Sequence, residues 1–163
     1  MPPSAPEPLA PHHRLDDFCC GVATLDDWLK KRARANQVNG ASRTYVTHDD
    51  GAVVGYYSIA SSSITVTEAA GKFKRNMPDP IPVVVLGRLA ISDTHQGKGI
   101  GKALMRDAIA RITAAGDEIG IRGVVVHAIN QSAKDFYLSL GFMQSPTHEM
   151  TLMITMNDLK ASI

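Results

Sequence analysis

Hydrophobic and polar positions alternate with a helical period early in the chain and with a strand period after it. The stretch "TLDDWLKKRARANQ", from Thr24, predicts a helix, because its apolar residues fall on one face: Leu25, Trp28, Leu29 and Ala33. Thr24 and Asp27 predict a capping box at its start. Two β-rich runs then flank Asp49-Asp50-Gly51, which is typical of a hairpin turn.

The second half of the chain predicts strands and helices in alternation. The apolar run "VVVLGRLAI" indicates a buried strand, and a helical stripe follows from about Ile100 to Ala115. "IRGVVVHAI" indicates another buried strand, "QSAKDFYLSLGF" a short helix that ends at Gly141, and "EMTLMITM" a last strand. This order predicts an α/β domain with a mixed sheet.

Length and composition limit the architecture and the compartment. A chain of 163 residues favours one domain, here 15–163. Residues 1–11 carry five prolines, so 1–14 is expected to form no regular structure and to be a flexible arm. The adjacent Cys19 and Cys20 argue against a disulfide framework or zinc ribbon, and the six histidines lack metal-ligand spacing. These spacings predict no metal site. The cysteines suit a reducing compartment and no apolar run is long enough for a membrane span, so a cytoplasmic protein is expected.

A glycine-rich turn separates the strand "VVVLGRLAI" from the helix that follows it. Bare backbone at a helix N-terminus favours a bound diphosphate, and two lysines add charge; the loop comprises Gln96, Gly97, Lys98, Gly99, Ile100, Gly101 and Lys102. The Walker and dinucleotide patterns both fail, because Ala103 replaces the metal-binding hydroxyl and position 102 is not glycine. The alternative is a tight turn that uses glycine for geometry alone.

"QGKGIG" resembles the pyrophosphate-binding signature of GNAT-fold N-acetyltransferases, and the resemblance extends across residues 83–142. "LGRLAI" is similar to the family's central strand, and "NQSAKDFYLSLGF" to its second motif. The resemblance implies acetyl-CoA as acetyl donor. It also implies a GNAT fold: a mixed, mostly antiparallel twisted sheet with a splayed central strand pair, flanked by helices.

Three further stretches resemble the toxins of type II toxin–antitoxin systems, which acetylate the α-amino group of aminoacyl-tRNA. They are "FCCGVATLDDWLKKRARANQVNG", "RTYV" and "PIPVVVLGRLAI". This narrower resemblance implies a block of translation, a DNA-binding antitoxin as partner, and a homodimer.

The GNAT resemblance also assigns roles to individual residues. Backbone groups of Leu89, Ala90 and Ile91 would hold the pantetheine arm, and Tyr137 would give a proton to the coenzyme A sulfur. Asn130 would hydrogen-bond the cofactor arm. The alternatives are that Tyr137 only packs in the core and that Asn130 only caps a helix.

The sequence gives no convincing general base for the acetyl transfer. His127 and Glu149 are candidates, but the pattern supplies no partner for either. An α-amino group, with a pKa near 7.7, is partly neutral at neutral pH without a base, whereas a lysine amine near 10.4 is almost fully protonated. An α-amine substrate therefore demands least from this chain.

Binding of tRNA requires positive charge, and local clusters exist although the net charge is only +1. The candidate RNA contacts are Lys30, Lys31 and Arg34 in the first helix, Lys72, Lys74 and Arg75 before the central strand, and Arg88 within it. The first-helix lysines could instead pair with Asp26 and Asp27 on a solvated face. The sequence shows no such acidic partners for 72–75.

Three functional hypotheses remain open on the sequence. The first is a toxin that acetylates aminoacyl-tRNA. The second is a GNAT enzyme that acetylates a protein N-terminus or a small-molecule amine. The third is mainly a regulatory or antitoxin-binding module, against which an intact Tyr137 and a complete glycine loop both argue.

Overall fold

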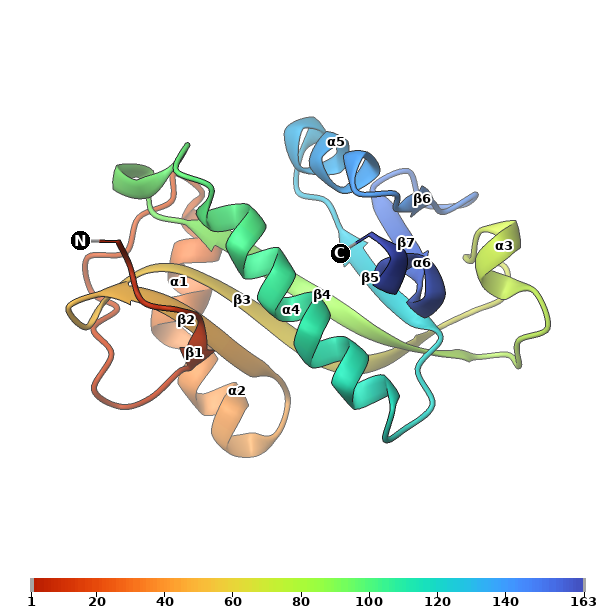
Figure 1. Cartoon of the computed structure of the whole chain (residues 1–163), viewed down its shortest axis with the longest axis horizontal. Coiled ribbons are helices and arrows are strands. Elements are labelled where there is room, and N and C mark those ends of the chain that lie inside the picture. The colour runs from red at the N-terminus through yellow and green to blue at the C-terminus, as the bar shows by residue number, and fades with distance from the viewer. Residues whose placement is uncertain (1, 163) are drawn as a thin grey trace. The chain divides into compact units, whose positions relative to one another are not determined.

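The computed structural model describes residues 2–162, which fall into two compact units (Figure 1). The first unit comprises residues 1–60 and 87–108, and the second comprises 61–86 and 109–163. Three elements contain residues of both units: β3 (Ala52–Ile64), β4 (Ile81–Ile91) and α4 (Ile100–Gly116).

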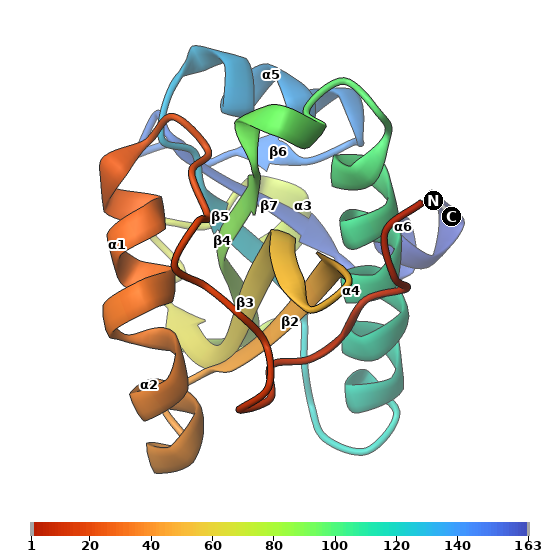
Figure 2. The ribbon, with the colours of Figure 1, turned by 90° about the vertical axis from the view of Figure 1, so that its left-hand side faces the viewer.

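The first unit joins an antiparallel sheet to helices on both of its faces. Besides its parts of β3, β4 and α4, it contains β1 (Glu7–Pro8), α1 (Ala23–Lys31), α2 (Ala33–Asn39), β2 (Arg43–Asp49) and the 3-10 turn η1 (Asp93–His95). The strand order is β1-β2-β3-β4, with antiparallel pairing of β1 with β2 and of β2 with β3. Figure 2 shows α1 and α2 on one side of β2 and β3, and α4 on the other.

Alternation along β3 explains this layering, because successive side chains of a strand point to opposite faces. Tyr56 is fully buried toward α1 and donates a hydrogen bond to the Leu25 carbonyl at 2.7 Å. Its neighbour Tyr57 points to α4 and donates to the Asp107 carboxylate. Gly55 shares that face, and a Cβ there would lie 3.0 Å from Thr47 Cγ2 and 3.2 Å from Leu104 Cδ1, so any larger residue would require these side chains to shift.

The expectation that residues 1–11 form no regular structure is wrong at Glu7 and Pro8, which pair with β2 as β1. Proline is tolerated there because β1 is an edge strand. Leu9 is buried, its N–H donates to the Thr44 carbonyl, and its own carbonyl accepts from Gln37. Burial of one leucine together with these long-range hydrogen bonds outweighs the local breakers.

The second unit contains the parallel strand pair. Besides its parts of β3, β4 and α4, it contains α3 (Gly71–Lys74), β5 (Gly123–His127), α5 (Gln131–Ser139), β6 (Met143–Gln144), β7 (Thr151–Thr155) and α6 (Met156–Ala161). Its strands follow the order β4-β5-β7-β6, in which β4 and β5 are parallel and the other pairs antiparallel. The predicted α/β class with a mixed, mostly antiparallel sheet is confirmed.

The pairing of β4 with β5 covers only part of β4. The parallel ladder runs from Val83 opposite Gly123 to Leu86 opposite Val126, whereas β4 continues to Ile91. β4 therefore continues for five residues beyond its ladder with β5, which itself ends at His127. Gly123 is required at the start of this ladder, because a Cβ there would collide with the Ile154 carbonyl.

Candidate active site

The glycine loop, residues 96–102, adopts the geometry that the sequence predicts, and its glycines have two different roles. Gly97 and Gly99 have φ values of 78° and 80°, in the left-handed region that side chains disfavour. A Cβ at either position would meet nothing within 4 Å, so the space over both is open. A Cβ at Gly101, by contrast, would lie 3.1 Å from Ile91 Cδ1, so this glycine lets α4 approach β4.

The Gln96 side chain fixes the start of the loop. Its amide nitrogen donates to the carbonyl oxygens of Ile91 and Cys20, each at 3.0 Å. The loop is thereby fastened both to the end of β4 and to the segment before α1. Gln96, predicted to contact the cofactor, has its side-chain amide committed to shaping the loop.

The loop presents several backbone N–H groups that have no acceptor in the described chain. The first helical hydrogen bond runs from Ala103 N–H to the Gly99 carbonyl, and no described acceptor receives the N–H groups of residues 97–102. Lys98 and Lys102 are exposed beside them. Free donors at the positive end of a 17-residue helix, with two ammonium groups, fit a diphosphate. The donor set therefore suits the diphosphate of a cofactor such as acetyl-CoA.

Leu89, Ala90 and Ile91 form the end of β4 that leads into this loop. Ala90 is buried, and Leu89 and Ile91 are half-buried. Because β4 outruns its ladder with β5 by five residues, Gly87–Ile91, this end keeps backbone groups that the ladder does not use. These are the groups that the GNAT resemblance assigns to the pantetheine arm.

In the second unit, Tyr137 lies on α5 with its ring packed between aromatic neighbours. The ring centroids of Phe136 and Phe142 are 5.3 and 5.4 Å away, and the residue is 7% exposed. The phenol oxygen has no hydrogen-bond partner among the described residues, yet it is not one of the fully enclosed oxygens, so it reaches solvent. Burial raises the pKa of Tyr137 to about 12, so the phenol keeps its proton at neutral pH.

Asn130 caps α5, as the alternative reading of this residue predicts. Its side-chain oxygen accepts a hydrogen bond from Ala133 N–H at 2.8 Å. The residue is exposed, and its amide N–H₂ group has no acceptor within residues 2–162. The cap fixes the side chain and leaves two donors for a ligand.

The candidate bases have partners that the sequence does not reveal. His127 Nδ1 lies 3.0 Å from Thr151 Oγ1, across the β5–β7 ladder. Glu149 lies 3.8 Å from Lys134 Nζ, a buried ammonium on α5. The Glu149 side chain is 77% exposed, and His127 is exposed as well, so neither residue stands out as a general base.

The cationic residues of α1 and α2 divide into exposed and committed groups. Lys30 and Lys31 are exposed, and the predicted pairing of Asp26 with Lys30 is wrong. Asp26 instead is buried and accepts a hydrogen bond from Cys20 N–H at 2.9 Å. Arg34 donates to the His13 carbonyl, so its guanidinium ties α2 to the N-terminal segment.

The basic segment 72–75 has an acidic partner after all, far away in the sequence. Lys72 Nζ lies 2.7 Å from the Asp158 carboxylate on α6. This hydrogen bond is the main reason why the pKa of Asp158 is lowered. Lys74 and Arg75 are exposed. Arg122, which the sequence did not suggest, donates to the carbonyls of Phe73 and Lys72. A groove of about 430 Å³ lies here, lined by Lys72, Arg75, Asn76, Met77, Arg122, Thr155, Asn157 and Asp158.

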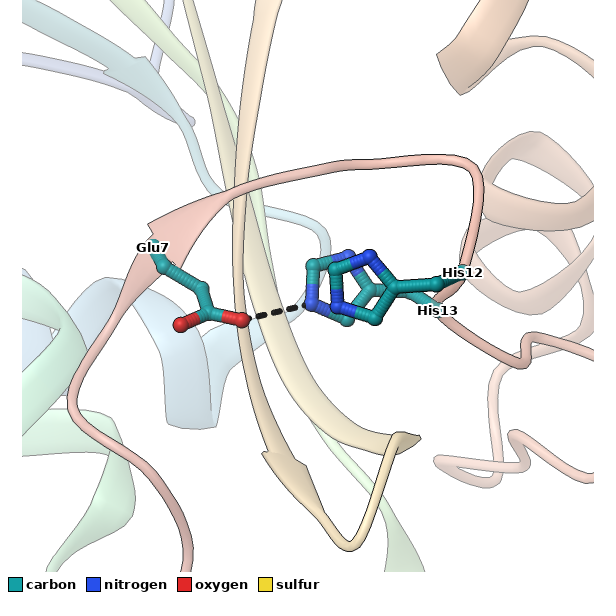
Figure 3. A group of neighbouring side chains, drawn as sticks. All are labelled: Glu7, His12 and His13. Atoms are coloured by element: carbon teal, nitrogen blue, oxygen red, sulfur yellow. Dashed lines mark hydrogen bonds and ion pairs between the residues drawn. The ribbon is translucent and has the colours of Figure 1, made fainter.

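Glu7, His12 and His13 form a cluster whose ligand atoms lie within 4.8 Å of one another (Figure 3). Glu7 Oε1 lies 2.7 Å from His13 Nε2 and 3.0 Å from His48 Nε2. In His13 and His48 the other nitrogen, Nδ1, accepts a backbone N–H, from Ala10 and from residue 51 respectively. Each neutral ring must then carry its proton on Nε2, the opposite of what a metal ligand at that atom needs. The cluster is therefore a hydrogen-bonded clasp that holds the N-terminal segment on β2.

A strand that outruns its parallel partner, followed by a glycine loop at a helix N-terminus, is the cofactor-binding arrangement of one acetyltransferase class. Residues 40–144 match the family model described as an acetyltransferase (GNAT) domain. The chain therefore belongs to the GNAT acetyltransferases, as the resemblance in its sequence predicts.

Individual relatives and solved structures show which members of this family the chain is similar to. The chain is 46% identical over 160 residues to the tRNA-acetylating toxin of Mycobacterium tuberculosis, covering 98% of this chain and 96% of that protein. It also resembles the toxin AtaT complexed with acetyl-methionyl-tRNAfMet, with a TM-score of 0.87 and 29% identity over 96% of each chain. A Tyr-to-Phe mutant of AtaT bound to acetyl-CoA and to the C-terminus of the antitoxin AtaR is similar, with a TM-score of 0.81 and 31% identity over 96% of this chain and 95% of that one.

No helix in residues 2–162 combines the length and the apolar composition that crossing a membrane requires.

Proposed function

We propose that this protein is a toxin that transfers the acetyl group of acetyl-CoA to the α-amino group of aminoacyl-tRNA in the cytoplasm and thereby blocks translation. The observation that carries the proposal is the glycine loop, whose unused N–H groups and exposed Lys98 and Lys102 suit a diphosphate. The identity of 46% to a tRNA-acetylating toxin, over nearly the whole of both chains, supports the choice of acceptor.

The residues divide the reaction into binding and proton transfer. The glycine loop binds the diphosphate of acetyl-CoA, and its pantetheine arm is held by Asn130 and by the end of β4 that comprises Leu89, Ala90 and Ile91. The neutral amine attacks the thioester carbonyl, the C–N bond forms, and the C–S bond breaks. The amine nitrogen loses a proton, and the departing sulfur gains one, for which Tyr137 is the donor. Its buried ring and its free hydroxyl suit this role, because the proton is present at neutral pH.

An α-amino acceptor is consistent with the structure because neither candidate base stands out. His127 and Glu149 both have side-chain partners. A free α-amine has a pKa near 7.7 and needs little help to lose its proton, whereas a lysine acceptor would need an effective base.

Exposed cations supply the contacts to the RNA backbone. In the first unit, Lys30 and Lys31 on α1 would contact RNA phosphates. In the second unit, Lys74 and Arg75 would do so together with Arg122, which lines the groove. Lys72 and Arg34 contribute charge while they are held by protein partners. Such contacts position a substrate without reading its bases.

The test is an acetylation assay with three acceptors. The purified protein is incubated with labelled acetyl-CoA and charged tRNA, with the same tRNA uncharged, or with free amines and peptides. We expect label on charged tRNA alone, and growth arrest when the protein is expressed in bacteria. Label on peptides or small amines, with none on charged tRNA, would reject the toxin in favour of a general amine acetyltransferase.

A DNA-binding antitoxin and a second copy of the chain complete the proposal as partners. AtaT, a structural relative, is bound to the C-terminus of an antitoxin in a solved complex. We expect the protein to be a homodimer when its mass is measured by light scattering, and we expect the product of an adjacent gene to co-purify with it and relieve the growth arrest. A monomeric mass would reject the dimer and leave the enzymatic proposal intact.

A further inference from the structure

The end of β4 presents different residues to its two faces, and both faces can be followed within the first unit. Ile91 points to α4, where its Cδ1 atom sets the approach of Gly101. Ala90 points to the opposite face, where it packs in a cluster with Leu25 and Tyr56 under α1. Arg88, two residues before Ala90, lies on this α1 face as well, because its guanidinium contacts Trp28 of α1.

Arg88 is held on an aromatic platform. Its Cζ atom lies 4.2 Å from the centroid of the Trp28 ring, and Trp28 is stacked on Tyr56 with an interplanar angle of 10°. Tyr56 in turn is fully buried, and its hydroxyl is fixed by the Leu25 carbonyl. The guanidinium therefore has one face covered by an indole that cannot easily move.

The N–H edge of this guanidinium has no acceptor. Within residues 2–162, no carboxylate pairs with Arg88, and no carbonyl or hydroxyl accepts from it. Asp26, a carboxylate on the same helix as Trp28, is committed to Cys20 N–H. The group is half-buried, and the loss of water around it lowers the pKa of Arg88. A partly desolvated cation with an unused planar edge suits a bidentate oxyanion.

We propose that Arg88, positioned by Trp28, binds a backbone phosphate next to the 3′ end of the RNA acceptor, on the face of β4 opposite the glycine loop. The inference rests on the proposed function. In an aminoacyl-tRNA the amino acid carboxyl is esterified and uncharged, so the nearest anion to the reacting amine is a phosphodiester. Exposed Lys30 and Lys31, on the same helix as Trp28, extend positive charge along this side. The acetyl donor and the acceptor therefore approach β4 from opposite faces.

The test compares Arg88→Gln with Arg106→Gln, a matched control that removes the same charge from an exposed position of α4 in the first unit. We expect Arg88→Gln to raise the KM for charged tRNA about tenfold to a hundredfold and to leave the KM for acetyl-CoA unchanged. The affinity for a minihelix ending in CCA, measured against salt, should lose about 0.7 to 0.9 from its slope. Arg88→Lys should restore the slope and only part of the affinity.

The outcomes separate this inference from the function on which it rests. If the wild-type protein acetylates no charged tRNA, both fail. If the wild type is active and Arg88→Gln binds the minihelix as tightly as Arg106→Gln, with the same salt slope, only the role of Arg88 is overturned. A rise in the KM for acetyl-CoA instead of tRNA would also overturn it, because it would place Arg88 on the donor side. A loss of slope that Arg88→Lys does not restore would show disturbed packing on Trp28 and reject the phosphate contact.

Discussion

Replacing Tyr137 by phenylalanine removes one oxygen and leaves the rest of its packing in place. The ring keeps its contacts with Phe136 and Phe142, and the lost hydroxyl has no hydrogen-bond partner in the described chain. The free energy of unfolding should therefore change by no more than about 0.5 kcal/mol, the usual range where no buried contact is broken. Any large loss of activity must then come from the reaction and not from the fold.

The expected loss follows from the proposed role of the Tyr137 hydroxyl as proton donor. General acid catalysis contributes about 10²- to 10⁴-fold, which corresponds to roughly 2.7 to 5.4 kcal/mol of activation free energy. The KM for acetyl-CoA should stay the same, because the glycine loop is untouched. The phenol itself should keep its proton beyond pH 10, the ordinary pKa of a phenol, because burial raises the pKa of Tyr137 to about 12; the phenolate absorbance of the wild type is compared with that of Tyr137→Phe, without tRNA.

The assay is the release of free coenzyme A thiol with charged tRNA as acceptor, together with thermal melts of both proteins. A fall in kcat of less than about threefold, too small for the loss of a general acid, would refute Tyr137 as the donor. So would a fall that a lower melting temperature accounts for. A phenolate absorbance that is present in the wild type near pH 10 and missing from Tyr137→Phe would show that the hydroxyl is not in the buried environment described above.

Three further predictions concern other parts of the first unit. Gly99→Ala should lower the free energy of unfolding by about 1 kcal/mol and weaken acetyl-CoA binding in calorimetry. Gly40 has a similar φ of 79° but is remote from the loop in sequence, so Gly40→Ala should lower stability alone. Equal losses of binding in the two variants would contradict this. Burial raises the pKa of Cys20 to about 11, so iodoacetamide at pH 8 should label the exposed Cys19 first, and faster labelling of Cys20 in peptide mapping would be the contrary result. The histidine contacts hold the pKa of Glu7 below its ordinary 4.5, so the stability it adds is complete above that pH and is lost as pH falls through the lowered value; Glu7→Gln should abolish this acid step in protease susceptibility of the N-terminal segment.

The sequence predicts best those features in which neighbouring residues cooperate. The glycine loop could be read because positive φ at Gly97 and Gly99 and the close approach at Gly101 are local requirements that only glycine meets. The cap at Asn130 could be predicted because it too depends on residues close together in the sequence. The same holds for the hairpin turn, since β2 ends at Asp49 and β3 begins at Ala52. The predicted ends of helices and strands were wrong where a side chain makes its hydrogen bond outside the predicted element.

The start of α1 shows how a local prediction fails. The predicted capping box of Thr24 and Asp27 is wrong: the helix begins at Ala23 after Val22, and no side chain caps it. Asp26, one residue from the predicted box, turns inward to bind Cys20 N–H. The helix start therefore depends on a contact with the preceding segment, which no periodicity within the helix reveals. In the same way "EMTLMITM" indicated a strand throughout, whereas Thr155 caps a helix through Asp158 N–H and the strand stops there.

Partners far apart in the sequence account for the remaining differences at the candidate site. Lys72 appeared free because its carboxylate, Asp158, is 86 residues away, and Arg122 appeared to be an ordinary strand residue because its acceptors lie in the segment after residue 71. Charge alone could not separate committed cations from available ones. Only the structure distinguishes Lys74, which is exposed, from Lys72, which is held.

The alternation of side chains along β4 determines which residues face α4 and which face α1. Ile91 and Gly101 close one face around the helix whose N-terminus suits a diphosphate, and Ala90 with Arg88 closes the other face under α1. Because a strand shows successive side chains to opposite faces, a one-residue slip of β4 would exchange the two sets. The arginine would then face α4, and Ile91 would face α1. Under the proposed function, the register of β4 keeps the two substrates on separate faces, and a strand residue, not a loop residue, would supply the contact to the acceptor.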